Sequence, residues 1–234
     1  MSEPRHIIVT GANRGLGLAL VTKLVARGDR VTATVRALPL DPTKALAKLH
    51  AAAPTQLDLH ACDMTKRESI AEFVATMQAH NITGLINNAG VWGDHQRIDD
   101  LDFAEAAALY QVNALAPLQL SLALRAPLRR ARGKIMHITS GLASIADNQS
   151  GGNYGYRMSK AALNMMSKSL AIDLRADGIA SAVVEPGWVQ TDMGGPNAPT
   201  TVDDSVRGLI EQFDALDART SGEFLSYRGG TMPW

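Results

Sequence analysis

The sequence predicts a doubly wound α/β (Rossmann) fold, in which helices cover both faces of one parallel sheet. Short apolar and β-branched segments, such as residues 6–10 and 179–184, are typical of strands buried on both faces. They alternate with helical patterns along the chain, which is the order of βαβ units. Because small and polar residues follow several of these strands, we expect a ligand site at the carboxyl edge of the sheet.

Composition and charge argue against several classes of protein. The chain has 234 residues, fits one domain (1–234) and carries 23 basic and 23 acidic side chains. This balance disfavours nucleic acid and anionic membranes as partners. We interpret the four arginines of residues 125–132 as the cation-rich end of a helix. With one cysteine, Cys62, and neither a signal peptide nor a membrane-span pattern, the expected location is cytoplasmic.

The turn after the first strand is the first feature that indicates chemistry. Its three glycines follow a Gly-x-x-x-Gly-x-Gly spacing between the strand and an apolar helix. Glycines in this context permit a tight turn and let backbone N–H groups and a helix N-terminus approach a pyrophosphate. The turn therefore predicts a dinucleotide site. Its predicted contact residues are Gly11, Asn13, Arg14, Gly15, Leu16 and Gly17.

The end of the second strand, residues 30–36, indicates which dinucleotide binds. Many dinucleotide folds have an acidic residue here that accepts hydrogen bonds from the adenosine ribose. This chain has Val35 and Arg36 instead, and Arg14 lies in the glycine turn. Two guanidinium groups suit a 2′-phosphate, so NADP(H) is predicted as the preferred cofactor, with NAD(H) as the alternative. The competing interpretation is that both arginines are ordinary surface residues.

The third and fourth strands add further candidates. A helix is predicted at 41–53 and a strand at 56–60, followed by Asp63 and Met64. Asp63 could accept from an adenine amino group, cap the helix that begins near Lys66, or do both. A helix at 70–80 and a strand at 82–86 lead to a small, amide-rich segment at the ligand edge. Its candidate cofactor residues are Asn88, Ala89 and Gly90.

Residues 103–130 have an unusually long helical pattern that contains Asn113 and Pro117. Proline has no N–H, so the carbonyl of Asn113 loses its intrahelical partner and the helix is expected to kink. A free carbonyl and a sideways amide would then be available to anchor an ordered water. The alternative is a loop that splits two helices.

The fifth strand, residues 134–140, ends in Ser140, and a long polar loop leads to a helix containing Tyr156 and Lys160. These two residues are spaced i, i+4 and share one helix face. A nearby ammonium favours the phenolate, so we predict a lowered pKa for Tyr156 and a role in general acid–base catalysis. The opposite face is apolar and is expected to meet a second subunit. That face contains Met158, Ala162, Met165, Ser169 and Ile172.

The sixth strand, residues 179–184, is followed by Pro186, Gly187 and Trp188. The segment that continues to residue 201 is expected to cover the active site, and Trp188 either lines the substrate pocket or packs the loop. A helix at 202–213 and a strand at 224–227 complete the pattern. The six histidines show no metal-ligand spacing, so no metal is predicted.

Together these motifs resemble the short-chain dehydrogenase/reductase family, in its order and close to its spacing. They are residues 10–17, Asp63, residues 87–90, Asn113, Ser140, Tyr156 with Lys160, and Pro186 with Gly187. Residues 155–164 and 229–234 resemble more narrowly the C-factor and sniffer-type carbonyl reductase branch. The resemblance implies seven parallel strands and a nicotinamide cofactor.

The resemblance also implies a catalytic tetrad of Asn113, Ser140, Tyr156 and Lys160. Tyr156 would protonate the alkoxide, Ser140 would hold the carbonyl oxygen, and Lys160 would lower the tyrosine pKa and bind the nicotinamide ribose. A water on the Asn113 carbonyl would relay protons to Lys160. Ser144 is a lesser candidate for the serine. Further implied cofactor contacts are Pro186, Gly187, Val189 and Thr191.

The expected function is therefore reduction of a small carbonyl compound, or oxidation of the matching alcohol, in a homodimer or homotetramer. The tryptophans in residues 91–101 and 188–201 favour a mostly apolar substrate. The alternative is a signalling or redox-sensing protein that binds NADP(H) without relevant turnover.

Overall fold

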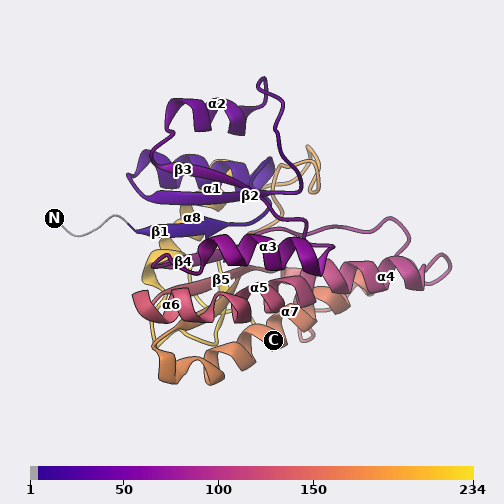
Figure 1. Ribbon diagram of the computed structural model, residues 1–234. Coiled ribbons are helices and arrows are strands. Elements are labelled where there is room, and N and C mark those ends of the chain that lie inside the picture. The colour runs from indigo at the N-terminus through magenta and orange to yellow at the C-terminus, as the bar shows by residue number, and fades with distance from the viewer. Residues whose placement is uncertain (1–4) are drawn as a thin grey trace.

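Seven parallel strands form one sheet in the computed structural model, which describes residues 5–234 (Figure 1). The strand order is β3-β2-β1-β4-β5-β6-β7, so the chain winds outward in both directions from the boundary between β1 and β4. Ligands bind at the carboxyl ends of strands at such a boundary. The predicted doubly wound fold is confirmed. The strands are β1 His6–Val9, β2 Arg30–Val35, β3 Leu57–Ala61, β4 Gly84–Asn87, β5 Lys134–Ile138, β6 Ala180–Glu185 and β7 Phe224–Ser226.

Helices cover both faces of the sheet and enclose two hydrophobic cores (Figure 1). The sheet separates the two cores, and side chains along β1 alternate between them: Ile7 and Val9 lie in one core and Ile8 in the other. On the first face lie α1 Gly15–Ala26, α2 Ala45–Ala52 and α8 Val202–Ala215. On the second lie α3 Arg67–Met77, α5 Ala116–Ala123, α6 Arg125–Ala131 and α7 Tyr154–Asp173. α4 Phe103–Tyr110 packs against α7.

The long helix predicted at 103–130 is interrupted twice. After α4 the chain forms a π-helical turn, Gln111–Leu115, in which the N–H of Ala116 donates to the carbonyl of Gln111. Pro117 then lies in the first turn of α5, where a missing N–H is tolerated. The π turn replaces the predicted proline kink, and the alternative of a loop here is wrong. A second break, at Leu124, bends the path by 59° into α6.

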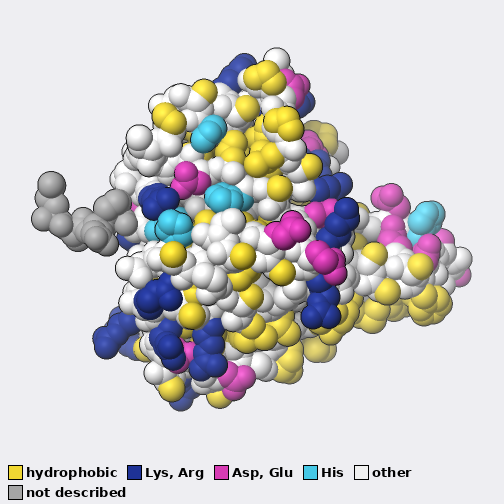
Figure 2. Space-filling model, viewed as in Figure 1, with side chains coloured by type: hydrophobic (Ala, Val, Ile, Leu, Met, Phe, Trp, Pro, Cys, Tyr) yellow, Lys and Arg dark blue, Asp and Glu magenta, His cyan; other side chains and the backbone are white. Residues whose placement is uncertain are grey.

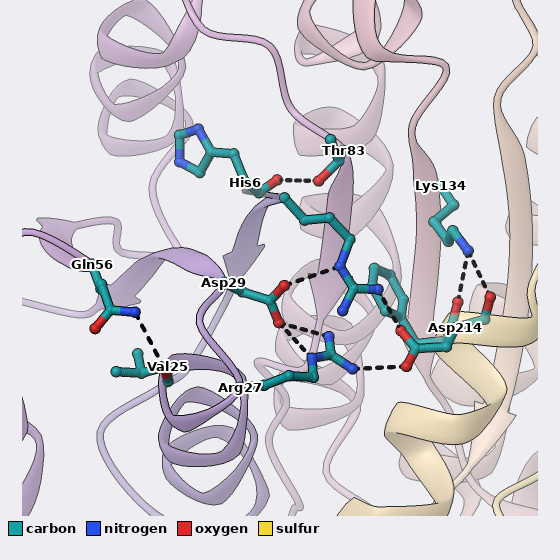
Figure 3. A network of polar contacts seen from close by, with 10 residues as sticks. His6, Val25, Arg27, Asp29, Gln56, Thr83, Lys134 and Asp214 are labelled. Carbon is teal, nitrogen blue, oxygen red and sulfur yellow. Dashed lines mark hydrogen bonds and ion pairs between the residues drawn. The ribbon is translucent and has the colours of Figure 1, made fainter. Parts of the chain in front are cut away.

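Charged side chains form a network of ion pairs at the amino edge of the sheet, opposite the edge where a ligand is expected (Figure 3). Arg5 and Arg27 each pair with both Asp29 and Asp214, at nitrogen–oxygen distances of 2.7–3.0 Å. Lys134 Nζ donates to the carbonyl oxygen of Asp214 at 3.0 Å. These residues flank β1, β2, β5 and α8, so the network joins elements that are distant in sequence.

Candidate active site

A cleft of about 580 Å³ opens at the carboxyl edge of the sheet, beside the boundary between β1 and β4. Its volume lies within the usual range for small-molecule and cofactor sites. Most of the predicted cofactor residues line it. They are Gly11, Asn13, Arg14, Gly15, Leu16, Gly17, Arg36, Asp63, Met64, Asn88, Ala89, Gly90, Tyr156, Lys160, Pro186 and Thr191.

The glycine turn leaves no room for a side chain at Gly11 or at Gly17. A Cβ on Gly11 would lie 2.9 Å from the Cα of Ala89, and one on Gly17 would lie 2.2 Å from the carbonyl oxygen of Gly11. Asn88 holds the turn from the neighbouring strand, because its Nδ2 donates to the carbonyls of Thr10 at 2.8 Å and Gly11 at 3.2 Å. The first turn of α1 therefore presents bare backbone N–H groups to the cleft.

Both predicted arginines lie at the cleft. Arg14 pairs with Asp192 at 2.7 Å, and both side chains are exposed. Arg36 follows β2 directly. Burial tends to raise the pKa of Asp63, but hydrogen bonds from Thr65 and the charges of Lys66 and Arg36 lower it overall. The rim thus carries two guanidinium groups.

Asp63 does not cap α3 as one interpretation expected. Its Oδ1 accepts from the backbone N–H of Thr65 at 3.0 Å and from the Thr65 hydroxyl at 2.7 Å. α3 begins at Arg67, with Lys66 as N-cap residue and no side-chain cap. Asp63 lies three residues before the N-cap residue Lys66, and its side chain is used in a tight turn with Thr65 instead.

Tyr156 and Lys160 lie on one face of α7, as predicted, and both are buried, with exposed fractions of 6% and 4%. Lys160 Nζ lies 5.8 Å from the centroid of the Tyr156 ring and donates to the carbonyl of Ile138 at 2.9 Å. Burial lowers the pKa of Lys160 to about 8. The Lys160 ammonium group therefore lies beside the Tyr156 ring, and it loses its proton at a lower pH than an exposed lysine does.

The predicted lowering of the Tyr156 pKa is wrong. Burial raises this pKa to about 12, and hydrogen bonding with Ser140 opposes the rise only in part. The prediction considered the charge of Lys160 but not the loss of water around the phenol, which disfavours the phenolate. Tyr156 is therefore a protonated donor at neutral pH.

Ser140 and Ser144 have different environments. Ser140 directly follows Thr139 at the end of β5 and accepts from the N–H of Leu142 at 3.2 Å. Ser144 is buried, accepts from the N–H of Asp147 and lies 3.4 Å from the carbonyl oxygen of Trp234. Its hydroxyl is thus used to hold a loop, whereas Ser140 interacts with Tyr156.

Asn113 is fully buried in the π turn, and its side chain is completely engaged. Its Oδ1 accepts from the N–H of Val91 at 2.8 Å, while Nδ2 donates to the carbonyl of Val91 and to the Ser159 hydroxyl. The side-chain amide is therefore not available to anchor an ordered water, as was predicted for it. A Cβ on Gly90 would lie 3.3 Å from Asn113 Oδ1 and 3.4 Å from Lys160 Nζ, so Gly90 separates the two side chains.

A buried histidine lies in the sheet next to Lys160. Asn87 Nδ2 is 3.1 Å from Nδ1 of His137, and Ser181 Oγ is 3.4 Å from Nε2. Both ring nitrogens of His137 thus have a polar partner in the core. Burial, followed by the charge of Lys160, lowers its pKa to about 3.

Gly187 and Val189 lie outside the group of residues that line the cleft. Gly187 has a φ of +82°, and a Cβ there would lie 2.8 Å from the Tyr227 ring, so close packing requires this glycine. Val189 is buried and forms a bridge with Thr200. Trp188 is 59% exposed, and its indole N–H donates to the carbonyl of Gly194 at 2.7 Å.

Three side-chain contacts at this site were not predicted from the sequence. The ring of Trp92 lies 4.5 Å from that of Tyr156, Gln96 accepts from the N–H of Tyr156, and Asp192 pairs with Arg14. They lie 64, 60 and 178 residues from these partners. No local spacing could have indicated such contacts.

Within residues 5–234, no group of three histidine, cysteine or acidic side chains is arranged to hold a metal ion. No single helix in that range is long and apolar enough to cross a bilayer. By length and composition alone, one bent pair passes that test, Phe103–Ala123 with Arg125–Ala131.

The chain is similar to known proteins over most of its length. A sequence model described as short chain dehydrogenase matches residues 5–201. The C-signal protein of Myxococcus xanthus is 47% identical over 151 residues, which cover 64% of this chain and 91% of that protein. The solved structure of the carbonyl reductase Sniffer of D. melanogaster has a TM-score of 0.92 and 30% identity, and covers 99% of this chain and 100% of its own. An NADPH-bound carbonyl reductase from chicken fatty liver has a TM-score of 0.90 and 34% identity, with 100% of both chains covered.

Proposed function

This chain belongs to the short-chain dehydrogenase family of oxidoreductases, and we propose that it is an NADP(H)-dependent carbonyl reductase acting through Tyr156. One observation carries the proposal most directly. A phenol and an ammonium group, Tyr156 and Lys160, are buried side by side in a cleft of cofactor size. Solved relatives named as carbonyl reductases, one with NADPH bound, support the same function.

The residues present fit a nicotinamide dinucleotide phosphate. Gly11 and Gly17 exclude side chains near the N-terminus of α1 and leave backbone there, which suits a pyrophosphate. Arg14 and Arg36 on the rim suit a 2′-phosphate, since guanidinium groups bind phosphate oxygens with two hydrogen bonds. Asp63 and residues 88–90 would line the part of the cleft that holds the adenosine. Thr191 would line the part that holds the nicotinamide. Pro186, Gly187 and Val189 would shape the loop behind it.

The remaining roles follow from burial and charge. When bound, reduced nicotinamide supplies the hydride for the carbonyl carbon. Tyr156, whose pKa is raised to about 12, is protonated at neutral pH and would donate its proton to the developing alkoxide. Lys160, with a pKa of about 8, is mostly charged at pH 7 and would stabilise the phenolate that remains. Ser140 would hold the carbonyl oxygen, and Asn113 would fix the segment beside Lys160.

NADPH oxidation against a panel of aldehydes, ketones and quinones tests this proposal. We expect turnover by the native protein and its loss in Tyr156→Phe, with NADPH affinity unchanged because the phenyl ring still fills the site. Ser144→Ala is the matched hydroxyl control for Ser140→Ala and should retain turnover. Full activity of Tyr156→Phe would show that the acid has been assigned wrongly.

The 47% identity to C-signal favours one second candidate, a signalling or redox-sensing protein that binds NADP(H) without relevant turnover. The same measurements separate the two functions. Tight NADPH binding with no oxidation across the whole panel favours the sensor.

The substrate we propose is a mostly apolar carbonyl compound. The Trp92 ring packs against Tyr156, which lines the cleft, and the half-exposed Met193 lines it too. Apolar side chains beside Tyr156 would bind apolar groups better than charged ones. Preferential turnover of strongly charged substrates would contradict this proposal.

We also propose that the protein works as a homodimer or homotetramer. Hydrophobic side chains gather along the edge formed by α4 and α7 (Figure 2). Phe103, Met158, Met165 and Ile172 are 57–80% exposed in the isolated chain. A second copy would bury this surface. Cys62 is free and buried, which fits the cytoplasmic location we propose.

A further inference from the structure

The segment that leaves β4, residues 91–96, lies against the first turn of α7. Gln96 is its most buried polar residue, with an exposed fraction of 3%. Its Oε1 accepts from the N–H of Tyr156 at 2.8 Å, and its main-chain carbonyl accepts from the N–H of Tyr154 at 3.3 Å. Its Nε2 donates to the carbonyl of Gly93 at 2.6 Å, which fixes the orientation of the amide.

These contacts supply what the helix lacks on its own. The first N–H groups of an α-helix have no partner within it, and a side chain usually caps them from the N-cap position. The N-cap residue of α7, Asn153, has a φ of 50° and makes no side-chain cap. Gln96 therefore takes over the N-cap function from 60 residues away, directly at Tyr156.

The segment is itself held in place from other elements. Glu105 of α4 accepts from the N–H groups of Asp94 at 2.9 Å and His95 at 2.8 Å. Trp92 packs its ring on Tyr156 at a centroid distance of 4.5 Å. Gln96 is thus a fixed point rather than a mobile side chain, and it can define where α7 begins.

We propose that Gln96 is a positioning residue for Tyr156, setting the place of the phenol relative to the bound carbonyl. The inference rests on the proposed acid role of Tyr156. Proton transfer needs heavy atoms within hydrogen-bond distance, and a misplacement of about 1 Å can cost roughly a hundredfold in rate. Gln96 is not among the residues lining the cofactor cleft, so its loss should reduce kcat without changing NADPH affinity.

Two substitutions and one control test this. Gln96→Leu keeps the approximate size but removes both amide functions, and kcat should fall about tenfold to a hundredfold. NADPH affinity, followed by fluorescence titration, should stay within about twofold of the native value. Gln78→Leu is the control, because Gln78 Nε2 donates to the carbonyl of Ala123 far from the cleft.

Gln96→Glu adds a pH-dependent readout. A neutral carboxyl group can donate to Gly93 and accept from Tyr156, as the amide does, whereas a carboxylate cannot donate. The kcat of Gln96→Glu relative to Gln96→Leu should therefore rise as the pH falls. Asp94, His95 and Glu105 are present in both variants, so their titration cancels in the ratio.

The outcomes separate this inference from the proposed function. Full activity of Tyr156→Phe would overturn the proposed acid itself. Loss of activity in Tyr156→Phe, with native kcat in Gln96→Leu, would overturn only the role of Gln96. A parallel loss of kcat and NADPH affinity in Gln96→Leu, with no recovery of Gln96→Glu at low pH, would assign Gln96 a structural role and also overturn the inference.

Discussion

Gly17→Ala should weaken NADPH binding strongly and lower the stability of the fold only moderately. A Cβ at this position would lie 2.2 Å from the carbonyl oxygen of Gly11 and 2.6 Å from Asn88 Nδ2. Real Cβ contacts are essentially never below 3.0 Å, so the turn must open by at least about 0.8 Å. Asn88 donates to the same carbonyl, and its hydrogen bond at 3.2 Å would be broken or rebuilt.

The expected loss of affinity can be derived from this displacement. A backbone hydrogen bond to a charged phosphate contributes roughly 1.5–3 kcal/mol, so losing one weakens NADPH binding by at least about tenfold. Because opening the turn displaces neighbouring N–H groups of the first turn of α1 together, we expect NADPH affinity to fall about a hundredfold. Overpacking would lower the free energy of unfolding by roughly 1–3 kcal/mol.

Fluorescence titration with NADPH and urea unfolding measure the two effects separately. Gly28→Ala is the control, because Gly28 has a φ of +93° and a Cβ there would meet no heavy atom within 4 Å. Alanine is strained at this φ, so the free energy of unfolding of Gly28→Ala should fall while its NADPH affinity equals that of the native protein. Native NADPH affinity in Gly17→Ala would refute the assignment of the turn to the pyrophosphate.

Three further predictions concern charge. Lys160 has a pKa of about 8, and its deprotonation removes the charge that stabilises the Tyr156 phenolate. The kcat/KM for carbonyl reduction should therefore be constant near pH 7 and fall about tenfold per pH unit well above pH 8. A profile that stays constant up to pH 10 would contradict this prediction. Arg36→Asp should weaken NADPH binding at least roughly tenfold more than NADH binding in parallel titrations, and equal losses would exclude a contact with the 2′-phosphate. His137 has its pKa lowered to about 3, so the unfolded chain binds its proton first as the pH falls below about 6.5. The free energy of unfolding should then decrease by roughly 1 kcal/mol per pH unit between pH 6 and 4, and His137→Gln, compared by urea unfolding at both pH values, should lose that part of the slope.

The features predicted correctly from the sequence depend on local patterns. Strand period, glycine spacing and the interval between Tyr156 and Lys160 each involve neighbours along the chain. They were sufficient for the doubly wound sheet and for most residues that line the cleft. The shared helix face of Tyr156 and Lys160 was also predicted, and Leu163, Ser167 and Ala171 continue this face into the core.

The errors arose where tertiary environment decides the outcome. The pKa of Tyr156 depends on how completely water is removed from it, which a spacing of four residues does not report. The π turn at Asn113 depends on packing of α4 against α7 and of α5 against α3. Gln96 caps a helix 60 residues away, and no motif in its own neighbourhood distinguishes it from a surface glutamine.

The π turn has a consequence for insertions and deletions in this chain. A π turn holds one residue more than an α turn in nearly the same rotation and rise, so it takes up an extra residue without turning α5 relative to α4. Removing one residue from Gln111–Leu115 would restore a regular α-helix and leave the contacts of α4 with α7 and of α5 with α3 in place. Removing one residue from within α4 or α5 would instead turn one helix relative to the other by about 100°, the rotation of a single α-helical residue. The π turn is therefore the place in this helical segment where chain length is least constrained.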